Sequence, residues 1–183
     1  MLTCDGCLTT LYLQDDRLLN AGQSGEMHDS PLLFGLGDRV RFGKTRVDIL
    51  GHARFSYGRG WWDEFWGMDR QGNGVWVSVD EGDVVVQRAL PDDDQPNIAR
   101  SARIGQETMF QGMDLRVTER DSATCIAVRG SFDETLFVGQ TYDFLNLEGP
   151  DGLLVSGEFS DDGEIWFAGE WFDPFEVEIG VAA

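Results

Sequence analysis

The chain has 183 residues and a formal net charge of −19, because 33 Asp and Glu residues outnumber 14 Lys and Arg residues. This length fits one domain or two small ones, and a hydrophobic content of 42% indicates a folded core rather than a disordered chain. The negative charge repels phosphate backbones, which excludes nucleic acid as a partner. No apolar run approaches the roughly 20 residues of a membrane helix, which excludes an integral membrane segment.

The N-terminal region carries two candidate metal ligands, Cys4 and Cys7, with the Cys-x-x-Cys spacing of a zinc knuckle. A structural zinc site needs four ligands, and the remaining candidates, Cys125, His28 and His52, are scattered along the chain. Three interpretations stay open: a vestigial knuckle without metal, a partial or shared metal site, and a redox pair. We expect no cofactor, with zinc as the single candidate.

The same end of the chain lacks the basic and apolar regions of a secretory signal. Three cysteines, an odd number, also argue against the disulfide framework that small secreted proteins use. We therefore expect a cytoplasmic protein with reduced thiols.

Short β-branched and aromatic runs alternate along the chain with turns rich in Gly, Asp and Asn. Such runs predict an all-β protein of antiparallel meanders connected by hairpins. In chain order, the predicted strands are Leu8–Leu13, Arg39–Phe42, Arg46–Tyr57, Trp62–Met68, Val75–Val79, Val84–Ala89, Glu107–Phe110, Asp114–Glu119, Thr124–Arg129, Thr141–Leu147, Leu153–Phe159, Glu164–Ala168 and Phe175–Ile179.

The two halves of the chain resemble each other. At a constant offset of 68 residues, Phe42 aligns with Phe110 and Val47 with Leu115. We interpret this likeness as a diverged duplication of one β-meander. The two copies are expected to form small barrels or one shared sandwich.

An acidic stretch bracketed by prolines separates the copies and contains no apolar side chain that could pack. The predicted division is a knuckle-like segment at residues 1–34, a first β repeat at 35–90, the acidic linker at 91–97 and a second β repeat at 98–183.

The most distinctive stretch is residues 61–66, which holds three of the six tryptophans and two carboxylates. Side chains alternate in an extended strand, so Trp62, Glu64 and Trp66 share one face. A carboxylate between two indole rings suits an ammonium or guanidinium ion, through charge and cation-π attraction. The alternative, which is usual for aromatic residues at strand spacing, is that the rings belong to the core.

Several motifs occur here in the order found in one known family. They are Ile-Leu-Gly-His-Ala-Arg-Phe at 49–55, Trp-Asp-Glu-Phe-Trp at 62–66, Val-Trp-Val-Ser at 75–78, Ser-Gly-Glu-Phe at 156–159 and Gly-Glu-Trp at 169–171. Together they resemble the bacterial domain-of-unknown-function family 4178, and the likeness extends over nearly the whole chain.

This resemblance implies no established activity. It implies an N-terminus with two Cys-x-x-Cys pairs like a zinc ribbon, of which the present chain keeps only Cys4 and Cys7. Members of the family are often associated with genes for polyamine-synthase-like enzymes and membrane-stress proteins, which implies an accessory role.

Two histidines and no serine in a nucleophile motif leave no catalytic constellation to assemble. The leading hypothesis is therefore a binding or adaptor module, not an enzyme, with an unidentified protein partner. The second hypothesis is a receptor for a small cation such as a polyamine, bound by Trp62, Glu64, Trp66 and Glu158. The third is an enzyme that uses carboxylates from both halves, such as Glu64 with Glu158.

Overall fold

The computed structural model describes the backbone of residues 2–3, 9–14 and 17–23 and the complete residues 25, 27, 30–160 and 163–180. This part of the chain is all-β. The strands are β1 Leu2–Thr3, β2 Thr9–Gln14, β3 Arg17–Gln23, β4 Arg39–Phe42, β5 Thr45–Ser56, β6 Trp61–Asp69, β7 Gly74–Asp80, β8 Asp83–Ala89, β9 Glu107–Phe110, β10 Met113–Gly130, β11 Thr141–Glu148, β12 Leu153–Ser160, β13 Gly163–Phe172 and β14 Glu178–Gly180. Three short 3-10 helices join them: η1 Asp92–Asp94, η2 Pro150–Gly152 and η3 Pro174–Glu176.

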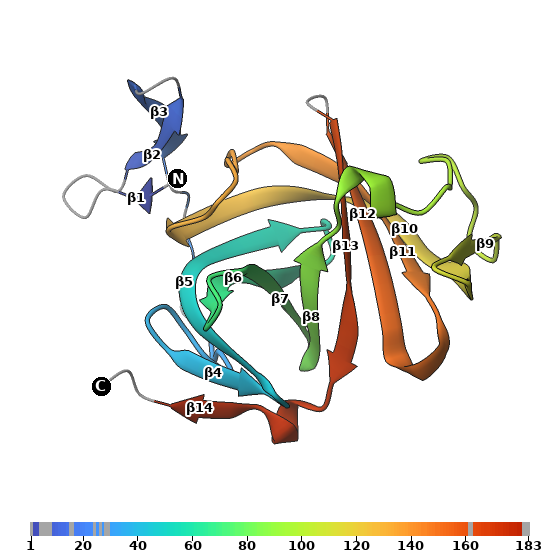
Figure 1. Cartoon of the computed structure of the whole chain (residues 1–183). Helices are drawn as coiled ribbons and strands as arrows, with labels where there is room; N and C mark the ends of the chain where they lie inside the picture. Colours follow the sequence, from blue (N-terminus) through green and yellow to red (C-terminus); the bar gives the residue numbers. More distant parts are fainter. Residues whose placement is uncertain are drawn as a thin grey trace.

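Eight strands close into one antiparallel barrel (Figure 1). Neighbouring strands follow the order β5-β6-β7-β8-β13-β12-β11-β10, and β10 pairs back onto β5. Strands β4 and β14 extend the sheet beyond β5, β9 lies beside β10, and β1, β2 and β3 form a separate small sheet. Closure gives each barrel strand two partners, which removes the unpaired backbone groups of an open sheet.

The barrel is built from two meanders of the same pattern, β4 to β8 and β9 to β13. Equivalent backbone hydrogen bonds occur near the start of each: the N–H of Gly37 donates to the carbonyl of Ile49 at 3.0 Å, and that of Gly105 to Val117 at 2.8 Å. These partners are 68 residues apart, the offset seen in the sequence. Both glycines have positive φ, 84° and 87°, which side chains disfavour.

Two seams join one meander to the other and thereby close the barrel. One is the antiparallel pairing of β5 with β10, and the other is that of β8 with β13. Closure therefore depends on both copies at once.

Buried apolar side chains form three clusters. The first meander packs Phe42, Val47 and Ile49 into a core outside the barrel wall, and the second packs their counterparts at an offset of 68 in the same way. A third cluster, here called the lumen core, fills part of the barrel interior. It consists of Ala53, Phe55, Trp66, Ala123, Cys125, Val128, Phe132 and Leu136.

The prediction of an all-β fold with antiparallel meanders is confirmed. Where the sequence left open small barrels or a sandwich, the two meanders share one closed barrel. The two strands predicted at 114–119 and 124–129 are one long strand, β10, because residues 120–123 between them pair in regular register with β11. The strand predicted at 175–179 is instead η3 followed by the short edge strand β14.

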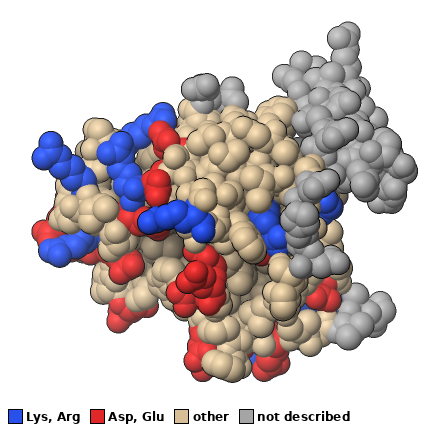
Figure 2. All heavy atoms as spheres, turned by 180° about the vertical axis from the view of Figure 1, so that it is seen from behind, with Lys and Arg blue, Asp and Glu red and all other residues tan. Residues whose placement is uncertain are grey.

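Charge is unevenly spread over the surface. On the face shown in Figure 2, basic side chains gather mainly toward one side, whereas acidic side chains are scattered over the middle and lower part. None of the helices in the described part of the chain is long and apolar enough to cross a membrane.

Candidate functional site

The barrel lumen contains a cavity of about 350 Å³ that reaches the turns connecting β5 with β6 and β7 with β8. Every barrel strand, or the turn next to it, contributes to its wall. Six carboxylates line the cavity, namely Glu64, Asp80, Asp83, Glu119, Asp121 and Glu158, together with a single basic residue, Arg59. The cavity is therefore strongly acidic.

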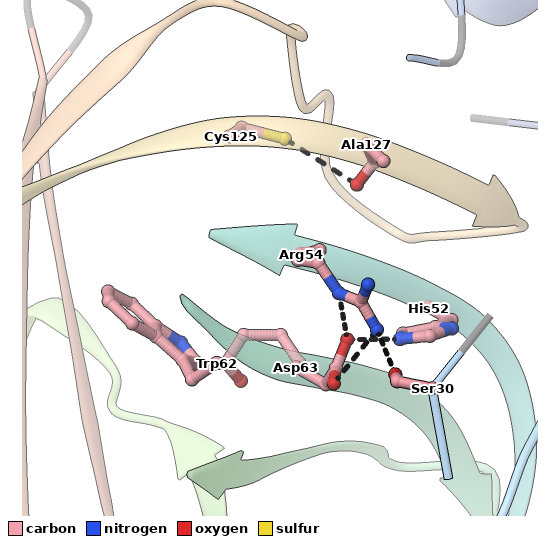
Figure 3. Close-up of polar contacts among 8 residues, drawn as sticks. Ser30, His52, Arg54, Trp62, Asp63, Cys125 and Ala127 are labelled. Carbon is pink, nitrogen blue, oxygen red and sulfur yellow. Dashed lines mark hydrogen bonds and ion pairs between the residues drawn. The ribbon is translucent and has the colours of Figure 1, made fainter. Parts of the chain in front are cut away.

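Strand β6 places Trp62 and Glu64 in the lumen because side chains alternate along an extended strand. Asp63, between them, points away from Trp62 (Figure 3). The ring of Trp62 stacks on Phe55, with centroids 5.6 Å apart, and meets the edge of Phe144 at 5.6 Å. These aromatic contacts fix the indole beside the carboxyl group.

Glu64 is held by neutral hydrogen-bond donors. Its Oε1 accepts from Nε1 of Trp62 and from Oγ of Ser78, both at 2.7 Å. Burial raises the pKa of Glu64 to about 7, because these two hydrogen bonds only partly offset the loss of hydration. The donors orient the carboxyl group but supply no positive charge.

Glu158 on β12 lines the same cavity. Burial, with the charges of Glu134 and Glu64, raises the pKa of Glu158 well above its ordinary value. The cross-strand pair Glu64 and Ser78 of the first meander corresponds to the pair Phe144 and Glu158 of the second. Each meander thus contributes one carboxyl group to the cavity. In the first meander it comes from the earlier strand of the pair, β6, and in the second from the later strand, β12.

A third carboxyl group enters the lumen from the loop at residues 131–140, which connects β10 with β11. In this loop Phe132 and Leu136 are buried in the lumen core, and Glu134 lies between them along the chain. Burial raises the pKa of Glu134 to about 7, and neighbouring carboxylates add to the effect. The corresponding connection in the first meander is the shorter turn at residues 57–60.

Three of the four residues predicted to bind a ligand, Trp62, Glu64 and Glu158, line this one cavity. Trp66 does not. It is 5% exposed within the lumen core, and its Nε1 has no hydrogen-bond partner in the described structure. Sequence reasoning did not point to Glu134, because an irregular loop carries no periodic signal of which side chains face inward.

The outer face of the same wall carries a buried ion-pair network (Figure 3). Asp63 Oδ1 accepts hydrogen bonds from Nε of Arg54 at 2.8 Å and from Nε2 of His52 at 2.7 Å. Burial by itself would raise the pKa of Asp63, but these bonds outweigh it and hold the pKa below its ordinary value. Arg54 also donates to Oγ of Ser30 at 2.8 Å.

The metal prediction falls on Cys4 and Cys7, which lie outside the described residues. Within the described part of the chain, no group of three or more His, Cys, Asp and Glu side chains is placed to hold a metal ion. Cys125 is free and buried in the lumen core, where burial raises the pKa of its thiol to about 12. It is therefore un-ionised at neutral pH.

A family model described as a domain of unknown function, DUF4178, matches residues 35–174. The matched region contains all eight barrel strands and all of the carboxyl groups described above. Neither a curated protein nor a solved structure matches the chain.

Proposed function

The chain thus belongs to the DUF4178 family, and from the geometry of its lumen we propose that the barrel is a receptor for a small organic ammonium ion. The observation that carries the proposal is the pair Glu64 and Glu158, which face one cavity whose single basic lining residue among the described residues is the exposed Arg59. Burying carboxyl groups without a counter-charge is costly, and a cation in the lumen would remove that cost.

The cavity wall also suits the non-polar part of such a ligand. Trp62 and Phe144 present aromatic surface beside the carboxyl groups, and Val85 and Leu154 add aliphatic surface. An ammonium group over an indole ring gains about 0.5 to 2 kcal/mol from cation-π attraction. A volume of about 350 Å³ falls at the lower end of the range for small-molecule sites.

The test is calorimetric titration of the purified protein with benzylamine and with spermidine, alongside benzyl alcohol as a neutral analogue. We expect saturable binding of the amines and none of the alcohol. Glu64→Gln keeps the acceptor for Trp62 and Ser78 but loses the charge, so amine affinity should fall by about tenfold, ~1.4 kcal/mol.

Glu170→Gln is the matched control, because Glu170 is exposed on barrel strand β13 and does not line the cavity. It should bind like the unmodified protein. Equal binding of benzyl alcohol, or no loss in Glu64→Gln, would contradict an ammonium receptor.

The adaptor role expected from the sequence is the second candidate. Its support is the segment around β14, where Phe175 is 96% exposed and Ile179 is 48% exposed next to an edge strand. Exposed apolar side chains beside a free strand edge suit pairing with a partner strand. Pull-down from native lysate with the chain and with Phe175→Asp tests it, because a partner of this surface should be lost in the variant.

An enzyme that uses Glu64 with Glu158 was the third function expected from the sequence. It needs both carboxyl groups in one cavity, and the lumen provides that arrangement. Turnover that disappears in Glu158→Gln would support it.

A further inference from the structure

The lumen continues beyond the main cavity as a narrow gap. Glu64, Glu134 and Glu158 all line this gap, whose volume of about 20 Å³ has room for roughly one water molecule. Glu134 and Glu158 also line a second cavity of about 300 Å³, bordered by the exposed residues Glu164 and Ile165. Glu158 therefore lies where the main cavity, the gap and the second cavity meet.

Three separate elements bring these carboxyl groups together: strand β6, strand β12 and the loop at 131–140. Among the described residues, no basic side chain lines the gap or the second cavity, and Arg59 at the mouth of the main cavity is exposed. Three ionised carboxylates in this position would repel one another through a medium of low dielectric. Without a cation beside them, these carboxyl groups therefore favour the protonated form.

Packing alone does not explain why residue 134 is a glutamate. Its loop already fills the barrel end with Phe132 and Leu136, and Phe132 stacks on Trp76 with ring centroids 5.8 Å apart. An apolar residue at 134 would avoid the desolvation of a carboxyl group. A carboxyl group in the middle of an apolar plug is expected where it takes part in binding.

We propose that Glu134 completes the lumen site as a third carboxyl group, and that an ammonium ion enters the lumen in exchange for protons held by Glu64, Glu134 and Glu158. This inference rests on the proposed receptor function. For each positive charge taken up, one proton leaves a carboxyl group for bulk water, so the total charge of the lumen is unchanged. Ligand uptake is then favoured as pH rises and release as pH falls.

Apart from the exposed Arg59 of the main cavity, the described groups that line these cavities with the three carboxyls are neutral or acidic. Ser78 on β7, Gln87 on β8 and Tyr142 on β11 are neutral at physiological pH, and burial raises the pKa of Tyr142 further. The remaining acids of the main cavity, Asp80, Asp83, Glu119 and Asp121, and the Glu164 of the second cavity add negative charge. Burial raises the pKa of Glu64 and of Glu134 to about 7, so proton exchange at these two groups falls in the neutral range. Burial, with the charges of Glu134 and Glu64, raises the pKa of Glu158 well above its ordinary value.

The test is calorimetric titration with benzylamine at pH 6, 7 and 8, each in two buffers that differ in ionisation enthalpy. The difference in heat between the buffers counts the protons released per ligand. We expect net proton release, and affinity rising by up to about tenfold per pH unit for each proton released. Glu134→Gln should still bind at pH 8, release fewer protons and show a shallower pH dependence.

Glu164→Gln is the control, because Glu164 borders the second cavity but is exposed and outside the gap. It should release as many protons as the unmodified protein. Binding without proton release, or an unchanged proton count in Glu134→Gln, would overturn this inference and leave the receptor intact. Absence of amine binding at every pH would instead overturn the receptor function itself.

Discussion

Asp63 and Glu64 are adjacent on β6, yet they face opposite sides of the barrel wall. Their pKa values are shifted in opposite directions. Asp63 is bonded to Arg54 and His52, and its pKa is lowered. Glu64 has only the neutral donors Trp62 and Ser78, and its pKa is raised to about 7. The partner, not the residue type, decides whether a buried carboxyl group keeps its charge.

Replacing Asp63 by Asn should destabilise the fold strongly, because it removes the buried ion pair between Asp63 and Arg54. We expect a loss of about 3 to 5 kcal/mol in the free energy of unfolding, measured by urea denaturation at pH 7. The pKa of Asp63 is lower in the folded than in the unfolded chain, so its contribution is present above the unfolded value of 3.8. The deficit of the variant should therefore shrink as pH falls below that value.

Asp48→Asn provides the comparison at an exposed ion pair. Asp48 bonds Arg39 at 2.6 Å, but the two side chains are 54% and 43% exposed. Loss of such a pair should cost under about 1 kcal/mol. Similar losses for Asp63→Asn and Asp48→Asn would show that the Asp63 network is not a buried one in solution.

Among the elements, the seam between β8 and β13 depends on a glycine. A Cβ on Gly169 would lie 1.9 Å from the carbonyl oxygen of Val86 and 2.7 Å from Cα of Gln87, both main-chain atoms of β8. Gly169→Ala should therefore force the seam apart and lower the free energy of unfolding by about 1 to 3 kcal/mol or more. Hydrogen exchange should show β8 and β13 opening first.

Gly35→Ala is the matched control for that substitution. Gly35 has no atom within 4 Å of a Cβ position and no positive φ, so Ala should be tolerated there. Seam amides that exchange equally slowly in Gly169→Ala and in the unmodified protein would contradict the close approach.

The elements also show what sequence could and could not predict. Alternation along β6 correctly grouped Trp62 with Glu64, because side-chain direction in a strand has a period of two. It could not separate Trp66 from them, because periodicity gives the face of a residue and not its depth along the barrel. Glu134 was missed for a related reason: its loop acquires an inward face only by packing across the barrel end. The likeness of the two halves was visible in the sequence. The pairing of β5 with β10 and of β8 with β13 was not, because these strands are far apart in the chain and no local pattern indicates which of them pair.

For the whole molecule, the lumen carboxyl groups make stability depend on pH. The pKa of Glu64 and of Glu134 is raised from 4.5 to about 7 on folding, so the folded chain holds protons that the unfolded chain releases. Their contribution is greatest below 4.5 and is lost as pH rises toward 7. We expect the free energy of unfolding of the ligand-free protein to fall by up to about 5 kcal/mol between pH 5 and pH 8, which is about 2.5 kcal/mol for each of the two groups.

Urea denaturation across this pH range measures the effect, with the double variant Glu64→Gln and Glu134→Gln as the comparison. Gln does not ionise, so the profile of the variant should be flatter than that of the unmodified protein. Parallel profiles would mean that these two groups are ordinary solvated carboxylates.

Each meander offers two strand edges that are satisfied only by the other meander. A single meander of this kind could satisfy those edges only by pairing with a second chain. Glu64 now stands where the second copy has Phe144, and Glu158 where the first has Ser78. The two walls of the lumen therefore differ, and under the proposed receptor function a ligand with two unlike ends would be bound in one orientation.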